Sequence, residues 1–97
     1  MHWDFHIKQF EHYLKLEKSL ASNSVEAYVH DIVKLRQFIE ISNEEINPDQ
    51  IKGSDLENFI AYLYELGVSP FTQARVISGI KAFYKYMLYE EVVFKDP

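Results

Sequence analysis

Residues 66–89 read LGVSPFTQARVISGIKAFYKYMLY, and this stretch indicates the fold of the chain. Ser69 is a typical helix N-cap, and Pro70 follows it at the first helical position, where its fixed φ fits and its missing N–H costs nothing. With 3.6 residues per turn, a helix over 70–89 has one apolar side. That side carries Val76, Ile77, Ile80, Phe83, Tyr84 and Met87. The stretch therefore predicts a long helix with one side in a core.

The opposite side of this predicted helix is basic and built from small residues. It carries Arg75, Ser78, Gly79, Ala82, Lys85 and Tyr86, with Lys81 on its flank. Small side chains let a helix backbone approach another surface, and a DNA major groove, about 12 Å wide, admits a helix of this kind. Two other interpretations stay open. Packing against another domain explains Gly79 and Ala82 equally well but the cations less well, and a basic stretch is also compatible with an ordinary solvated face.

Three further amphipathic segments precede this one, at about 4–18, 24–41 and 54–66. Asn23 with Glu26 and Ser54 with Glu57 have capping-box spacing, and Gly67 suits a left-handed helix end. The Asn47-Pro48 pair breaks any helix between the second and third segments, and Ile46 and Ile51 are expected to fold this connection onto the core. No segment of useful length shows the period-two alternation of a strand. The sequence predicts a compact all-α bundle of four main helices, at about 4–18, 24–41, 54–66 and 70–89.

Length and composition narrow the class of protein. With 97 residues and 47% apolar content, the chain predicts a single domain with a real core. It has no cysteine, which excludes disulfides and thiolate metal sites and suits a reducing compartment. No apolar run approaches the roughly 20 residues of a membrane span, and no signal peptide is visible. These features predict a cytoplasmic protein without a membrane partner.

The charge of the chain is unevenly distributed. The sequence has 15 acidic and 10 basic residues, yet residues 66–89 contain no Asp or Glu. The segment 44–68 has six acids and one base, which equals the whole net charge of −5. A locally cationic helix on an acidic protein favours a directional contact with a polyanion. The alternative is a helical protein–protein interaction module that uses the acidic 44–68 surface.

The segment at 24–41 has a polar side as well. Opposite its apolar stripe lie Ala27, His30, Lys34 and Gln37. The start of the segment, Ser22-Asn23-Ser24, offers hydroxyls and unpaired helix N–H groups, which suit a phosphate oxygen. Capping explains one of these three residues by itself, so this signal gains weight only beside the basic helix at 70–89.

Two motifs resemble the core-binding domain of Xer-type tyrosine recombinases and phage integrases. LEK at 16–18, LASNS at 20–24 and Tyr28 with Asp31-Ile32 are similar to the family pattern L-E-K-x-L-S-x-N-T-x-x-x-Y-x-x-D-L. Ser69, Thr72, Arg75 and the following ISGIKAFYKY are similar to S-x-x-T-x-x-R-x-L-S-x-L-R-x-F-Y-x-Y-L. Asp96-Pro97 resembles the Asn-Pro that begins the family's linker to a catalytic domain. The resemblance implies a SAM-like integrase N-terminal domain over residues 1–97, with a catalytic domain expected to follow residue 97.

In that family the small helical domain and the catalytic domain close around duplex DNA as a clamp. Carried over by position, the implied DNA-contacting residues lie on the second and fourth helices. They are Ser24, Ala27, His30, Thr72, Arg75, Ser78 and Lys81. By chemistry, Arg75 is a candidate for a guanine contact, and Ser24, Lys34, Lys81 and Lys85 are candidates for phosphate contacts. The implied partners are double-stranded DNA, the chain's own catalytic domain and other recombinase subunits.

No catalytic residue, metal ligand or cofactor site is predicted in this chain. The family's catalytic arginines, histidines, lysine and nucleophilic tyrosine belong to the other domain, and helical packing explains Tyr84, Tyr86 and the other tyrosines here. His2 and His6 have i, i+4 spacing, but no H-E-x-x-H motif occurs. The sequence therefore predicts a non-catalytic domain of a DNA breaking and rejoining enzyme.

Overall fold

The computed structural model describes residues 3–42 and 46–90, and all of its regular secondary structure is helical. In chain order they are α1 (Trp3–Leu16), α2 (Ser22–Ile41), the short 3-10 helix η1 (Pro48–Gln50), α3 (Gly53–Glu65) and α4 (Pro70–Tyr89). No strand occurs in these two ranges. The predicted all-α fold with four main helices is confirmed, and no predicted helix end is wrong by more than two residues. Asp96-Pro97 lies outside the described residues.

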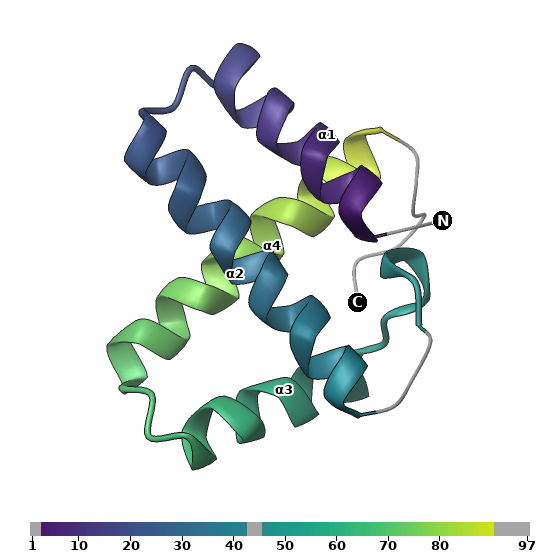
Figure 1. Ribbon diagram of the computed structural model, residues 1–97, viewed down its shortest axis with the longest axis vertical. Coiled ribbons are helices and arrows are strands. Elements are labelled where there is room, and N and C mark those ends of the chain that lie inside the picture. Colours follow the sequence, from purple (N-terminus) through teal and green to yellow (C-terminus); the bar gives the residue numbers. More distant parts are fainter. Residues whose placement is uncertain (1–2, 43–45, 91–97) are drawn as a thin grey trace.

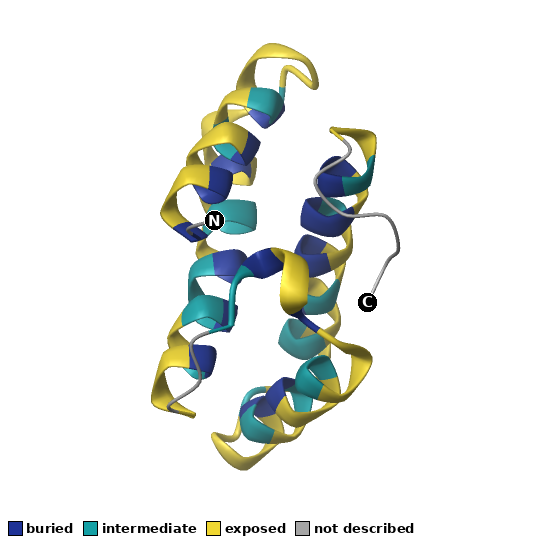
Figure 2. Ribbon diagram, turned by 90° about the vertical axis from the view of Figure 1, so that its right-hand side faces the viewer, coloured by how far each residue is buried: buried dark blue, intermediate teal, exposed yellow. Residues whose placement is uncertain are grey.

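The long helices α2 and α4 cross near their midpoints and form the centre of the fold (Figure 1). The helix α1 packs against α2, and α3 packs against α4. The buried positions of the helices face the interior, while the exposed positions form the outer surfaces (Figure 2). The candidate functional site lies where these two central helices meet.

The core is apolar and rich in aromatic rings. Phe83 of α4 is fully buried and meets the ring of Phe10 edge to face, with centroids 5.3 Å apart. Such aromatic pairs stabilise by about 0.5–1.5 kcal/mol beyond their area burial. Tyr86 packs on the same cluster, with centroids 4.7 Å from Tyr13 and 5.7 Å from Phe10. The end of α4 is therefore held against α1.

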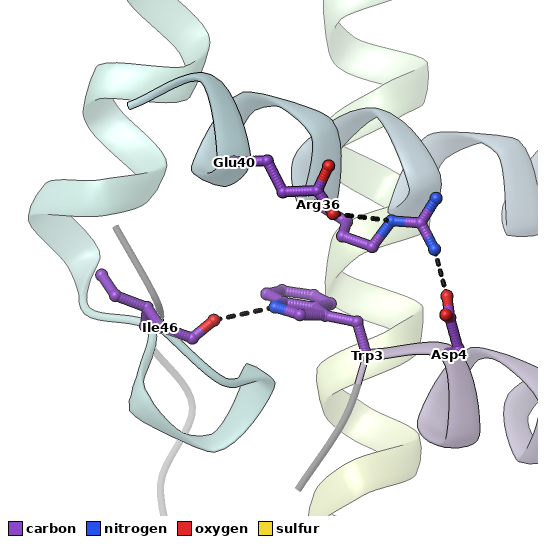
Figure 3. Close-up of polar contacts among 5 residues, drawn as sticks. All are labelled: Trp3, Asp4, Arg36, Glu40 and Ile46. Carbon is purple, nitrogen blue, oxygen red and sulfur yellow. Dashed lines mark hydrogen bonds and ion pairs between the residues drawn. The ribbon is translucent and has the colours of Figure 1, made fainter. Parts of the chain in front are cut away.

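The connection between α2 and α3 is tied to the core by polar and apolar contacts. The buried hydroxyl of Tyr84 donates a hydrogen bond of 2.7 Å to the carbonyl of Pro48 in η1. The indole Nε1 of Trp3 donates a 2.8 Å hydrogen bond to the carbonyl of Ile46 (Figure 3). Ile51 is buried and Ile46 is half-buried, as the sequence pattern predicts for two residues that fold this connection onto the core.

Arg36 of α2 is engaged by acidic side chains on two helices. Its Nη1 pairs with the carboxylate of Asp4, and its Nε lies 3.6 Å from Oε1 of Glu40 (Figure 3). The pair with Asp4 links α1 to α2, although ion pairs with exposed partners contribute little to stability. Since two carboxylates offset its charge, Arg36 adds little to any cationic surface.

Helix ends agree with the sequence at α4 and differ at α2 and α3. Ser69 caps α4, with its Oγ accepting a 3.2 Å hydrogen bond from the N–H of Thr72, and Gly67 has a φ of +81°. The predicted capping box of Asn23 and Glu26 is wrong, because α2 begins at Ser22 after Ala21 and has no side-chain cap.

The predicted capping box at the start of α3 is also wrong. Ser54 and Glu57 do not form it, because α3 begins one residue earlier, at Gly53. The carboxylate of Asp55 accepts a 2.8 Å hydrogen bond from the N–H of Lys52 and takes the role that the sequence pattern gave to Glu57. Both differences concern local hydrogen bonds at helix ends and leave the four predicted helices in place.

Candidate DNA-binding surface

A cleft between α2 and α4 brings together four of the predicted DNA-contacting residues. Ser24 and Ala27 line it from α2, and Arg75 and Ser78 line it from α4. Tyr28 and Asp31 complete the walls of this cleft, whose volume is about 150 Å³. The two sequence segments that carry the family motifs, far apart in the chain, therefore meet at one place on the surface.

The central polar contact of the cleft is an ion pair between the helices. Nη1 of Arg75 donates a 3.2 Å hydrogen bond to Oδ2 of Asp31, and Nη2 lies 3.1 Å from Oδ1. The carboxylate of Asp31 is only 1% exposed, whereas the Arg75 side chain is 42% exposed. Arg75 thus has one edge in the protein and another at the surface. The predicted outward position of Arg75 agrees with this exposure, whereas its ion pair with a buried carboxylate is not part of the prediction.

Burial determines the protonation chemistry of Asp31. Loss of solvation raises the pKa of Asp31 above its ordinary value of 3.8, and the nearby Arg75 charge and hydrogen bond partly oppose this rise. Lys34 and His30, on the same helix, act on this pKa in the same direction as Arg75, with smaller effects. A buried carboxylate with a single guanidinium partner therefore lies beneath the proposed contact surface.

Gly79 explains how α2 comes so close to α4. A Cβ atom built at this position would lie 2.4 Å from Oδ2 and 2.9 Å from Cβ of Asp31, closer than real contacts allow. Gly79 and Tyr86 are buried, so the prediction that both lie on the outer side of the helix is wrong. The small residue serves the crossing with α2, so its absence of a side chain is no argument for a DNA groove.

The other predicted residues lie around this cleft or beyond it. His30 is exposed and Lys34 is half-buried on α2. Thr72 is half-buried, and its hydroxyl accepts a 3.1 Å hydrogen bond from Ser69, so it belongs to the helix cap. Lys85 is exposed on α4. These positions are compatible with a surface that extends from the cleft along both helices.

Lys81 lies apart from the cleft, on the side of α4 that faces α3. It is exposed and borders an apolar cavity of about 370 Å³ between these helices. The other lining residues are Leu56, Phe59, Ile60, Ile77, Ile80 and Tyr84. A role for Lys81 in DNA binding would therefore place it at the edge of the surface, consistent with the flank position that the helix geometry predicts.

Asp31 is the residue of this site that the predicted set omits. Its position was visible in the sequence, because it falls among the apolar residues Tyr28, Ile32 and Leu35 with helical spacing. A carboxylate inside an apolar stripe needs a buried partner, since an unpaired buried charge is costly. That requirement was the available signal for an arginine on a facing helix.

The part of the chain that the structure describes has no candidate metal site. Residues 3–42 and 46–90 contain no cluster of three or more His, Asp or Glu side chains placed to bind a metal ion. His6 is buried, and its predicted partner His2 lies outside these ranges.

None of the described helices combines the length and apolar character needed to span a bilayer.

Titration of Asp31 gives a stability prediction with a definite sign. Because its native pKa is raised, the folded chain holds this proton over a pH range in which the unfolded chain has lost it. The contribution of Asp31 to the free energy of unfolding is therefore largest below the ordinary value of 3.8 and is lost as pH rises through the native pKa. We expect wild type to lose stability relative to Asp31→Asn as pH rises from about 3.8 through the native pKa of Asp31.

Urea unfolding of both proteins at several pH values measures this difference. The comparison isolates Asp31, because every other carboxylate titrates in both proteins. A difference that grows in favour of wild type with rising pH would contradict the raised native pKa.

Comparison with known proteins identifies the family of this chain. The family model for the phage integrase N-terminal SAM-like domain matches residues 7–91. The chain belongs to this family. It is 29% identical over 91 residues to tyrosine recombinase XerD of Listeria monocytogenes, an alignment that covers 94% of this chain and 31% of the relative.

Two further relatives show the same pattern. The chain is 33% identical over 91 residues to tyrosine recombinase XerD of Staphylococcus saprophyticus, covering 94% of this chain and 30% of the relative. It is 32% identical over 95 residues to tyrosine recombinase XerC of Anoxybacillus flavithermus, an alignment that covers 97% of this chain and 31% of the relative. The chain thus spans about a third of the length of these relatives. The search of solved structures found no match.

Proposed function

We propose that this chain is the DNA-binding core of a site-specific tyrosine recombinase and clamps duplex DNA through α2 and α4. The observation that carries this proposal is the shared cleft, where Ser24 and Ala27 of one helix meet Arg75 and Ser78 of the other. Two helices of a recombinase-family domain thus contribute side chains to one surface. We expect residues 1–97 to form this single DNA-binding domain, and strand cleavage to require a catalytic domain elsewhere in the parent protein.

The charge of α4 supports DNA as the partner. Arg75, Lys81 and Lys85 are exposed, and no acidic residue occurs between residues 66 and 89. Lysines of this kind contact phosphates and release counterions, which makes affinity fall with salt. Lys34 and the hydroxyl of Ser24 would extend the phosphate contacts along α2. Duplex DNA and other recombinase subunits bound to it are the partners that this proposal implies.

A second candidate function is docking to another protein. The acidic segment 44–68 has exposed apolar side chains, with Tyr64 at 75% and Leu66 at 61% exposure, and Phe71 nearby in sequence is 82% exposed. Exposed apolar groups of this size favour protein contacts when they form a patch. Such docking would depend on this surface and would be indifferent to the cations of α4.

We predict that Lys85→Ala weakens duplex binding and lowers its salt dependence. Because the net charge of the chain is −5, we expect wild-type affinity in the nonspecific range, with a Kd of about 10⁻⁴ to 10⁻⁶ M. Loss of one phosphate contact should reduce the slope of log K against log salt by about 1. Fluorescence anisotropy of a labelled 30-base-pair duplex, titrated at several salt concentrations, measures both quantities.

The matched control is Lys52→Ala. It removes the same charge from an exposed position just before α3, outside the α2–α4 surface. Equal losses in the two variants would mean that DNA responds only to net charge. Salt-independent binding by wild type would also reject the proposed phosphate contacts.

A further inference from the structure

The geometry of the Asp31–Arg75 pair determines which guanidinium donors remain available at the surface. The carboxylate faces the two terminal nitrogens, with Nη1 to Oδ2 at 3.2 Å and Nη2 to Oδ1 at 3.1 Å. A guanidinium has five N–H donors in a fixed planar arrangement. The two terminal nitrogens therefore face the carboxylate, with a hydrogen bond from Nη1, while Nε–H and the second N–H of each terminal nitrogen do not take part in this pair.

Asp31 is itself held in place. It is 1% exposed, and its carboxylate and Cβ lie directly against the backbone of α4 at Gly79. The pair also crosses between helices, because Asp31 belongs to α2 and Arg75 to α4. An arginine side chain normally has high rotamer entropy. Here a fixed carboxylate on the facing helix restricts it before any ligand arrives.

We propose that Asp31 is a positioning residue that fixes Arg75 across the cleft for contact with a DNA phosphate. This inference rests on the proposed function and names the role of its central arginine. Because Asp31 holds the guanidinium against α2, Arg75 is not extended toward a base edge on the floor of a major groove about 8.5 Å deep. The Nε–H and the terminal N–H groups that do not face the carboxylate suit a phosphate oxygen at the protein surface. Arg75 then contributes to DNA affinity whatever the base sequence, and it does not make the guanine contact expected from its residue type.

The proposal makes a prediction that opposes simple electrostatics. Asp31→Asn removes a negative charge next to the surface, which by charge alone would strengthen DNA binding. If Asp31 positions Arg75, the same change weakens binding, by about three- to tenfold, because the guanidinium must be ordered on association. The matched control is Glu26→Gln, which removes one negative charge from an exposed position of the same helix. We expect this control to bind as tightly as wild type or more tightly.

Anisotropy titrations of wild type and both variants on two duplexes of unrelated sequence measure these effects. Weaker binding by Asp31→Asn on both duplexes, with no loss in Glu26→Gln, supports the proposal. Tighter binding by both variants would overturn it, since Asp31 would then only compete with DNA for Arg75. A loss confined to one duplex would overturn the phosphate assignment and favour base contact.

Two further measurements separate this inference from the proposed function. Side-chain NMR of the Arg75 Nε–H group, without DNA, should show an ordered group in wild type and Glu26→Gln and a mobile one in Asp31→Asn. Equal order in all three proteins would overturn the positioning role even if DNA binds. Absence of duplex binding by wild type would reject the proposed function and the phosphate contact together, and the ordering of Arg75 would stand alone.

Should Asp31→Asn fail to fold, Arg75→Lys provides the second test. Lysine keeps the positive charge but lacks the planar fork that pairs with both carboxylate oxygens. We expect the same loss of DNA affinity as in Asp31→Asn. Unchanged affinity in Arg75→Lys would show that charge alone suffices and would overturn the inference.

Discussion

Arg75→Ala lowers the free energy of unfolding by about 2 kcal/mol, since it leaves the carboxylate of Asp31 buried without its partner. Loss of one member of a fully buried ion pair costs about 3–5 kcal/mol. The expected value is smaller here because Arg75 is 42% exposed and solvent already screens part of its charge. Urea unfolding of both proteins at pH 7 measures the loss. The native pKa of Asp31 should rise further in this variant.

Two comparisons make this expectation specific. Lys85→Ala removes the same charge from an exposed position of the same helix and should change stability by less than about 0.5 kcal/mol. In an Asp31→Asn background, Arg75→Ala should cost much less, because no buried charge is left behind. Equal, small effects of Arg75→Ala and Lys85→Ala would show that the pair does not hold the two helices in solution.

The four helices could be predicted because each has an apolar stripe long enough to specify its type. Ser69 and Pro70 place the start of α4, and Gly67 supplies the left-handed residue before it, as the structure confirms. These signals are local, since they depend on residues within a few positions of one another. The fold class, the number of main helices and the folding of 46–51 onto the core follow from the same pattern.

The capping of α2 could not be predicted in the same way. Its start is set by the turn that leaves α1, where Ser19 has a φ of +51° and the N–H of Leu20 bonds the carbonyl of Leu14 at 3.1 Å. This turn delivers the chain to Ala21, so α2 begins before Asn23 can act as a cap. Several Ser and Asn residues in a row gave no basis for choosing among them.

The prediction of which residues lie on the outer side of α4 was wrong at two positions, and the reason is the packing of this helix. A helix with one neighbour buries a narrow stripe, but α4 contacts α2 and α3 and reaches α1 through Tyr86. Its buried arc is therefore wider than the apolar residues alone indicate, and it includes Gly79. The partner of Arg75 depends on which residue of α2 faces Gly79. Periodicity within one helix cannot determine that register between two helices.

The crossing itself is the part of the structure most sensitive to a single change. Gly79→Val places a branched side chain where even a Cβ atom would lie 2.4 Å from Oδ2 of Asp31. The carboxylate cannot simply turn away, because Arg75 holds it and the interior around it is packed. Either α2 and α4 separate or Asp31 leaves its partner. Both responses cost free energy, and we expect a loss of about 3 kcal/mol or more in the free energy of unfolding.

The control for this prediction is Ser78→Val, one position earlier on α4. It introduces the same branched residue into the same helix, but at an exposed position, so it measures the intrinsic cost of valine there. We expect that cost to stay below about 1 kcal/mol. Urea unfolding of both variants gives the comparison, and the pH dependence of Gly79→Val reports whether Asp31 still lies buried beside Arg75. Similar stability of the two variants would mean that the helices do not approach at Gly79, and the paired carboxylate beneath the surface would lose its physical basis.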